Sequence, residues 1–273
     1  MFFSEMTRIP FFKLHGARND FLLTWSEDAP AGALPEIAAA ICDRHSGVGA
    51  DGWMLVDRTP GDGFDASIRL FNSDGSEPEI SGNGTRCAAA LLARGDVSRK
   101  EFRIRTGAGI KHLRLLSREG EHFEFEMNMG APRVVERQAT VQGRDAVLLD
   151  VGNPQCVFPV EDFDFDWLAV GAATERDPRF PNRTNVSFVR RVDGNTIDVR
   201  FWERGAGHTN SSGTGSTGAA AGALVRGCIS TPVLVRTPAG TLVVRAEGDV
   251  LFLTGPAEFI AEGAYYSLNV VPK

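Results

Sequence analysis

The sequence has few of the features that mark membrane, secreted or nucleic-acid-binding proteins. No apolar run approaches the roughly 20 residues of a transmembrane helix. Residues 1–12 include Glu5 and Arg8 and no small-residue cleavage site, so we expect no signal peptide. Basic residues are scattered and the net charge is −6, which argues against nucleic acid or an anionic membrane as a partner. We therefore expect a cytoplasmic protein.

Cysteine is also scarce. The four cysteines are widely and irregularly spaced, which suits neither a disulfide framework nor a zinc site: Cys42, Cys87, Cys156 and Cys228. Free cysteine is among the most buried residue types. We expect these side chains in the core, and we expect no bound metal.

The remaining composition is that of a soluble globular chain of 273 residues, with 42% hydrophobic and 23% charged residues. Glycines separate many short apolar runs, and residues 101–105 alternate polar with apolar side chains, as a half-buried strand does. Helical patterns are fewer, and the candidates are 35–45, 85–94, 166–175 and 218–226. The sequence thus predicts a β-rich α+β chain.

Two segments, 68–90 and 199–221, look like copies of one element. They align without a gap at an offset of 131 positions, so that Ser212 corresponds to Ser81. Each segment reads as a strand, a polar loop and a Gly-rich entry into an Ala-rich helix. The offset is near half the chain length, so we expect two similar domains, 1–130 and 131–263, with the last strand, about 264–273, returning to the first. Small helices of this kind fit inside a curved sheet.

A serine stands just before each Ala-rich helix. The first N–H groups of a helix have no intrahelical partner and carry partial positive charge. Glycines beside them let a ligand approach, so two such helix starts facing each other would hold a carboxylate or phosphate. For either helix alone, the simpler interpretation is that Ser81 or Ser212 is an ordinary N-cap. The matched pair favours a site.

Residues 47–52 (GVGADG) fit the G-x-G-x-x-G pattern of dinucleotide-binding proteins. That fingerprint needs a strand before it and a helix after it. Here the patterns predict a helix before and a strand after, so we expect no nucleotide cofactor.

Nearly the whole chain resembles the diaminopimelate epimerase family. The matching motifs come in order along the sequence: 13–21 (KLHGARNDF), 44–52 (RHSGVGADG), 71–77 (FNSDGSE), 82–87 (GNGTRC), 152–154 (GNP), 183–186 (RTNV) and 202–207 (WERGAG). The resemblance implies two pseudo-symmetric domains, each a β-barrel-like sheet around a central helix. It also implies cofactor-free inversion at Cα of LL- or meso-diaminopimelate, in the synthesis of lysine and cell-wall precursors.

In this family two cysteines work on opposite faces of the substrate carbon, one as thiolate and one as thiol. Here the corresponding catalytic positions hold Ser81 and Ser212. A serine hydroxyl acts as a base or nucleophile only when a neighbour takes its proton. A relay from Ser212 to His208 is one option, although a loop or pocket-lining role for His208 is the stronger interpretation. Gln155 stands where the family often has His.

The resemblance also implies a set of substrate-binding residues. The distal amino-acid end of diaminopimelate would be bound by Asn72, Asn185, Glu203 and Arg204. The cleft would be lined by Asn19 and Asn153, and the reacting carboxylate would be held by backbone N–H groups around Gly82, Asn83, Gly213 and Thr214. Arg204 suits a carboxylate and Glu203 suits an ammonium group.

Three hypotheses stay open from the sequence. The chain is a diaminopimelate epimerase-like isomerase whose serines are either native or introduced in place of cysteines. Alternatively, it is a related racemase, dehydratase or isomerase with another substrate, or a non-catalytic amino-acid binder. We expect a small-molecule amino-acid substrate in each case, and a homodimer is an option because the family often dimerises.

Overall fold

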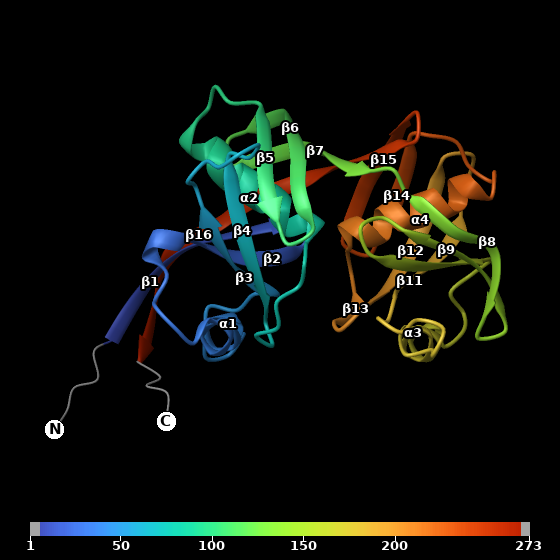
Figure 1. Cartoon of the computed structure of the whole chain (residues 1–273), viewed down its shortest axis with the longest axis horizontal. Coiled ribbons are helices and arrows are strands. Elements are labelled where there is room, and N and C mark those ends of the chain that lie inside the picture. The colour runs from blue at the N-terminus through green and yellow to red at the C-terminus, as the bar shows by residue number, and fades with distance from the viewer. Residues whose placement is uncertain (1–5, 269–273) are drawn as a thin grey trace. The chain divides into compact units, whose positions relative to one another are not determined.

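The computed structural model describes residues 6–268, and Figure 1 shows its elements. The chain forms two compact units, of which the first comprises 6–125 and 256–268 and the second 126–255. The expected returning strand covered 264–273, and residues 269–273 lie outside the described part. Among the described residues, no helix is both long and apolar enough to cross a membrane.

The first unit is a closed eight-stranded barrel. Its strand order is β1-β2-β3-β4-β5-β6-β7-β16, and pairing of β16 with β1 closes it. The strands are β1 (Met6–Gly16), β2 (Asn19–Trp25), β3 (Gly52–Asp57), β4 (Ala66–Asn72), β5 (Glu101–Thr106), β6 (Gly109–Glu119), β7 (His122–Gly130) and β16 (Val250–Leu268). Its helices are η1 (Ser26–Asp28), α1 (Leu34–Cys42) and α2 (Gly82–Gly95).

The second unit repeats this plan. Its strand order is β16-β15-β14-β12-β11-β10-β9-β8, with β13 paired to β12. The strands are β8 (Arg133–Val141), β9 (Arg144–Asp150), β10 (Pro154–Val160), β11 (Asn185–Arg191), β12 (Thr196–Glu203), β13 (Gly207–Thr209), β14 (Val233–Thr237) and β15 (Gly240–Glu247). Its helices are α3 (Trp167–Glu175) and α4 (Gly213–Val225). The predicted fold class, two barrel-like domains of one α+β chain, is confirmed.

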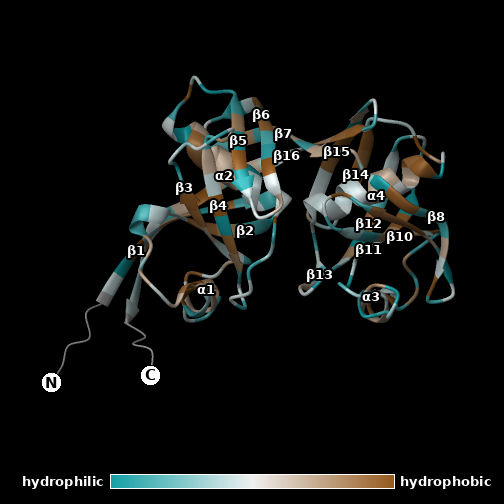
Figure 2. Ribbon diagram, viewed as in Figure 1, coloured by the Kyte–Doolittle hydropathy of each residue, from teal (hydrophilic) through white to brown (hydrophobic). Residues whose placement is uncertain are grey.

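Helices α2 and α4 are enclosed by strands, and Figure 2 shows how pale the Gly- and Ala-rich α4 is on the hydropathy scale. A Cβ added at Gly218 or Gly222 would lie 2.9 Å from the side chain of Gln155 or Val157 on β10. Three consecutive alanines in each helix are at most 2% exposed. Small side chains are therefore what lets each sheet wrap its helix closely.

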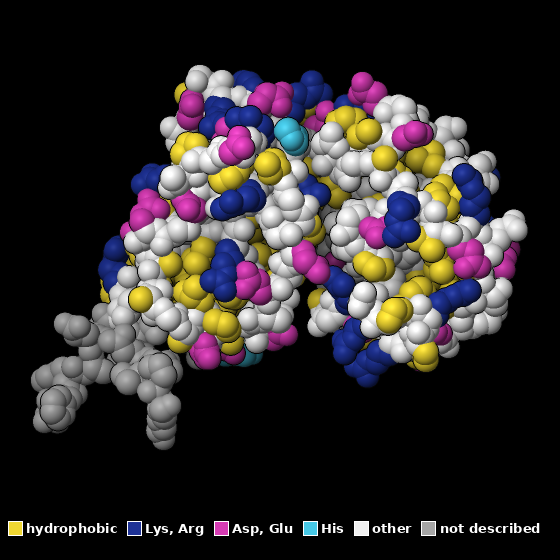
Figure 3. Space-filling view, viewed as in Figure 1, with side chains coloured by type: hydrophobic (Ala, Val, Ile, Leu, Met, Phe, Trp, Pro, Cys, Tyr) yellow, Lys and Arg dark blue, Asp and Glu magenta, His cyan; other side chains and the backbone are white. Residues whose placement is uncertain are grey.

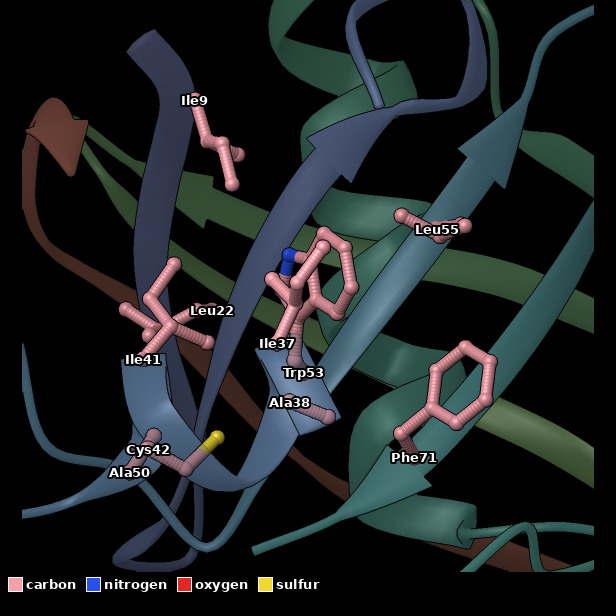
Figure 4. Packing of buried hydrophobic residues seen from close by; sticks show 10 residues of the cluster. All are labelled: Ile9, Leu22, Ile37, Ala38, Ile41, Cys42, Ala50, Trp53, Leu55 and Phe71. Carbon is pink, nitrogen blue, oxygen red and sulfur yellow. The ribbon is translucent and has the colours of Figure 1, made fainter. Parts of the chain in front are cut away.

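Larger apolar side chains fill the space between α1 and the first barrel (Figure 4). Trp53 is fully buried, stacks on Phe71 at 6.0 Å, and donates its indole N–H to Thr24 Oγ1 at 2.9 Å. Ile37 and Ile41 of α1 pack on this cluster, so one face of the helix is buried. On the face of each unit that Figure 3 shows, charged side chains of both signs are interspersed.

Candidate functional site

Ser81 and Ser212 are both N-caps, as the sequence predicts. Ser81 Oγ accepts a hydrogen bond from Gly84 N at 3.1 Å, and Ser212 Oγ accepts one from Gly215 N at 3.0 Å. Both serines have extended backbone dihedrals, which is usual for N-caps. We call the capping serine and first turn of each helix its helix mouth: residues 81–84 for α2 and 212–215 for α4.

The α2 mouth lies at one end of a chain of side-chain hydrogen bonds. Arg86 Nη2 donates to Asn83 Oδ1 at 2.6 Å, and Asn83 Nδ2 donates to Asn19 Oδ1 at 3.2 Å. Asn19 Nδ2 in turn donates to Asp51 Oδ2 at 2.6 Å. The chain joins a guanidinium to a carboxylate through two amides that point the same way. It brings the predicted residues Asn19 and Asn83 together and fixes both amide orientations.

Arg86 is the buried end of this chain and is fully inaccessible to solvent. Its other hydrogen bonds go to the backbone carbonyls of Pro256, at 3.1 Å, and Gly82, at 3.4 Å. Burial disfavours the charged form and lowers the pKa of Arg86 to about 10. The α2 mouth is thus backed by a cation that the surrounding protein solvates poorly.

Asp51 is the exposed end of the chain, and a second ion cluster holds it in place. Arg44 Nη2 lies 2.8 Å from Asp51 Oδ1 and 2.7 Å from Asp20 Oδ1. Lys13 Nζ lies 3.2 Å from Asp20 and donates to Gly49 O at 2.6 Å. Burial tends to raise the pKa of Asp20, but bonding to Arg44 and Lys13 outweighs it, so the pKa is lowered. Asp51, in the GVGADG segment, is therefore held in place by Arg44. The segment lies between α1 and β3, which is the expected order of a helix before it and a strand after it.

Asn72 lies at the end of β4 and organises a turn. Its Nδ2 donates to Ser76 Oγ at 2.9 Å, and its backbone N donates to Ser76 O at 2.8 Å. The next residue, Ser73, donates its backbone N–H to Asp51 O at 3.0 Å, so the turn lies beside the exposed end of the Arg86 chain.

The α4 mouth differs from the α2 mouth because a carboxylate accepts the hydrogen of its serine. Ser212 Oγ donates to Glu203 Oε2 at 2.7 Å, and Thr209 Oγ1 donates to Glu203 Oε1 at 2.6 Å. Ser212 is only 3% exposed, so this bond is shielded from water. A hydroxyl bonded in this way can pass its proton to the carboxylate while it receives another.

His208 does not take part in that arrangement. Its exposed side chain sits edge-on to Trp167, with the ring centroids 5.1 Å apart, whereas the Ser212 hydroxyl donates to Glu203. The structure therefore does not form the relay from Ser212 to His208, and it places His208 in the short strand β13, paired with Trp202, rather than in a loop.

Two further pairs of predicted residues meet in the second unit. Asn185 Oδ1 accepts from Arg204 N at 3.1 Å, and Asn185 Nδ2 donates to Pro154 O at 3.1 Å. Asn153 Nδ2 donates to Thr214 Oγ1 at 3.4 Å, which ties the 152–154 loop to the α4 mouth. Gln155 Nε2 donates to Asn153 Oδ1 at 2.6 Å, whereas the buried Gln155 Oε1 has no hydrogen-bond partner among residues 6–268.

Glu175, which no sequence motif indicates, supports the turn that follows Glu203. It accepts hydrogen bonds from Trp202 Nε1 and Gly205 N, each at 2.9 Å. Burial tends to raise the pKa of Glu175, but these bonds and the nearby Arg183 outweigh it and lower the pKa. An acidic side chain at the end of a short helix carries no motif, so only the fold reveals this role.

No metal or redox centre stands out in the part of the chain that the structure describes. No group of three or more His, Cys, Asp or Glu side chains in residues 6–268 is placed to hold a metal ion. Cys87 follows the α2 mouth in sequence, but burial raises its pKa to about 12. Its thiol is therefore unsuited to proton transfer near neutral pH.

Comparison with protein families gives a match over most of the chain. The diaminopimelate epimerase family model matches residues 11–135 and 147–260. The curated diaminopimelate epimerase of Pelotomaculum thermopropionicum is 37% identical over 276 residues, covering 93% of this chain and 98% of that protein. That of Desulfitobacterium hafniense is also 37% identical, covering 92% of this chain and 96% of that protein.

Solved structures share the fold at lower sequence identity. A hydroxyproline epimerase from Agrobacterium vitis has a TM-score of 0.75 at 14% identity, covering 97% of this chain and 94% of that chain. A PhzF-family phenazine biosynthesis protein from Bacillus anthracis has a TM-score of 0.71 at 17% identity, covering 94% of this chain and 98% of that chain. At these identities the likeness shows the fold alone.

Proposed function

The chain belongs to the diaminopimelate epimerase family, and from this premise we propose that it binds LL- and meso-diaminopimelate as a cofactor-independent isomerase. The reaction is inversion at Cα. Inversion requires one group that removes the Cα proton and another that returns a proton from the opposite face. Ser81 and Ser212 occupy the two positions for these groups, and each lies at the N-terminus of a helix, where a carboxylate is favoured.

The observation that carries the proposal is the bond from Ser212 Oγ to Glu203 at 2.7 Å. As Ser212 Oγ takes the proton from Cα, its own proton passes to the Glu203 carboxylate, so the number of protons balances. The electron pair of the broken C–H bond stays on Cα and spreads into the substrate carboxylate. The positive helix N-terminus stabilises that charge.

Ser81 lacks comparable help in the described structure. Its Oγ accepts from Gly84 N, and within residues 6–268 no hydrogen bond links this hydroxyl to Asp51, the carboxylate at the far end of the Arg86 chain. Proton return at this position therefore relies on a weakly acidic hydroxyl. We propose that the Ser/Ser form binds the substrate but inverts it slowly, and that position 81 limits the rate.

The remaining binding roles are part of the same proposal. Arg204 would bind the distal carboxylate, and Asn72 and Asn185 would bind the distal polar groups. Asn19, Asn153 and the backbone of Gly82, Asn83, Gly213 and Thr214 would surround the reacting end. A cytoplasmic location and a homodimer remain predictions.

The test follows Cα–H exchange in D₂O by NMR with LL- or meso-diaminopimelate. The Ser/Ser chain, Ser81→Cys, Ser212→Cys and the double variant are compared, with binding measured separately by calorimetry. We expect the double variant to exchange and invert. General acid–base groups typically contribute about 10²–10⁴-fold, so the Ser/Ser chain should be slower by a factor in or above that range.

Comparing the two single variants gives a more specific expectation. Ser81→Cys alone should accelerate exchange more than Ser212→Cys alone, because Ser212 already has a carboxylate partner. Binding of another amino acid in preference to diaminopimelate would favour a related isomerase. Binding without exchange in every variant would favour a non-catalytic binder, and no binding at all would reject the substrate.

A further inference from the structure

The two helix mouths occupy equivalent positions in the repeat but differ in charge. By the 131-residue offset, Arg86 corresponds to Thr217, and Asn72 corresponds to Glu203. Arg86 Nη1 and Thr217 Oγ1 both donate to the carbonyl four residues earlier, Gly82 O at 3.4 Å and Gly213 O at 2.9 Å. The same structural position therefore holds a cation in α2 and a neutral hydroxyl in α4.

The Arg86 charge is not paired directly with an acid. Among residues 6–268, its hydrogen bonds go to two backbone carbonyls and one amide oxygen, and none goes to a carboxylate. Other arginines of this unit, such as Arg44 and Arg103, bond carboxylates. Moving a cation into the interior without such a partner is costly, which indicates that its charge serves another purpose.

Charges on the neighbouring elements do not neutralise it. Helix α2 packs on β1, β2 and β5. Asp20 of β2 is bonded to Arg44 and Lys13, and His15 of β1 lies 3.8 Å from Glu258 of β16. The other charged residues of β1 and β5 are exposed: Arg8, Glu101, Arg103 and Arg105.

We propose that Arg86 is a positioning residue that makes the α2 mouth hold an anion, whereas the α4 mouth accepts a proton. The inference rests on the proposed function, since it assigns unequal roles to the two proton-transfer positions. The guanidinium bonds the first two residues of α2, so it adds to the partial charge of the helix N-terminus. At α4, a group at position 212 shares its hydrogen with Glu203 instead.

A thiol at each position measures this difference in the protein without substrate. Cys228→Ser provides the background, because burial raises the pKa of Cys42 and Cys87 to about 12 and also raises that of Cys156. Ser81→Cys and Ser212→Cys are then made separately, and thiolate absorbance is followed against pH. An unperturbed cysteine thiol has a pKa of about 8.5.

We expect the Ser81→Cys thiol to have a pKa at least about one unit below that of the Ser212→Cys thiol. At position 81 the Arg86 cation favours the thiolate, whereas at position 212 ionisation costs the thiol its hydrogen bond to Glu203. Adding Arg86→Met should raise the first pKa by about one unit and leave the second unchanged. Arg86→Lys should restore most of the shift. Glu203→Gln should lower only the pKa at position 212.

Equal pKa values at the two positions, or no response of position 81 to Arg86→Met, would overturn the inference. If Arg86→Met fails to fold, the comparison of the two thiols and the Arg86→Lys variant still decide it. The titrations use no substrate, so failure of the proposed reaction leaves their outcome readable. Conversely, inversion of diaminopimelate with equal pKa values would uphold the function and reject the role of Arg86.

Discussion

Replacing Arg86 with Met tests whether this residue holds the fold together or tunes the site. The substitution leaves Asn83 Oδ1 and Pro256 O without their donor, at about 1–3 kcal/mol each. Gly82 O keeps the backbone bond that the helix provides. Against this loss, burial lowers the pKa of Arg86 to about 10, which corresponds to about 3 kcal/mol of unfavourable burial that the variant removes.

The two effects largely offset each other, so we expect Arg86→Met to change the free energy of unfolding by no more than about 3 kcal/mol. Urea denaturation followed by tryptophan fluorescence measures it, with Arg103→Met as a control. Arg103 is exposed and pairs with Asp65, so its loss should cost under about 1 kcal/mol. A loss above about 5 kcal/mol for Arg86→Met would refute the reasoning and make Arg86 a structural residue.

Three further predictions concern the second unit. Gly215→Ala places a Cβ 2.9 Å from Ser212 Oγ and should cost about 1–3 kcal/mol in urea denaturation while displacing the serine. Bonding to Arg236 holds the pKa of Asp198 below its usual range. Asp198 therefore contributes its full stabilisation above about pH 4, near the pKa of an unfolded Asp, and loses it as the pH falls through its lower pKa in the folded state. In Asp198→Asn, the unfolding midpoint should fall less steeply as the pH is lowered through this range. Only Cys228 should react quickly with iodoacetamide near neutral pH, since the other three thiols are buried; mass spectrometry of the labelled peptides checks this.

The enclosed helices could be predicted because their local signals agree. Ser81 and Ser212 favour N-caps, the following glycines admit close packing, and the alanines suit a helix surrounded by sheet. The turn at 193–195, which joins the antiparallel strands β11 and β12, has the sequence Asp-Gly-Asn, which favours a tight hairpin turn. In these places propensity and tertiary structure demand the same residues.

Other elements could not be predicted, because their local sequence patterns disagree with the fold. Residues 133–141 look like a polar connection, yet they form β8, an edge strand that exposes much of its surface. The Gly255-Pro256 pair suggests an end to the strand at 250–254, yet β16 continues to Leu268. Pro256 lacks an N–H to donate, but its carbonyl accepts from Arg86.

The hydrogen-bond chain from Arg86 to Asp51 was beyond sequence reasoning for a different reason. Its members belong to separate motifs, and the bond from Asn83 to Asn19 spans 64 residues. Considered alone, each of these side chains could bond many different partners. The partners are determined only when closure of the barrel brings together β2, α2 and the loop before β3.

The two serines show that the requirements of helix capping differ from those of proton transfer. An N-cap needs an oxygen that accepts one hydrogen bond, which is worth about 1 kcal/mol relative to alanine, and Ser81 and Ser212 meet that need. Proton transfer needs a group whose pKa lies near the working pH, and serine meets that need only with a partner such as Glu203. Exchange of thiol for hydroxyl at a helix mouth thus preserves the cap, the anion-binding N–H groups and the packing. Under the proposed function, the rate of inversion depends on electrostatic support around each hydroxyl, which differs between Ser81 and Ser212.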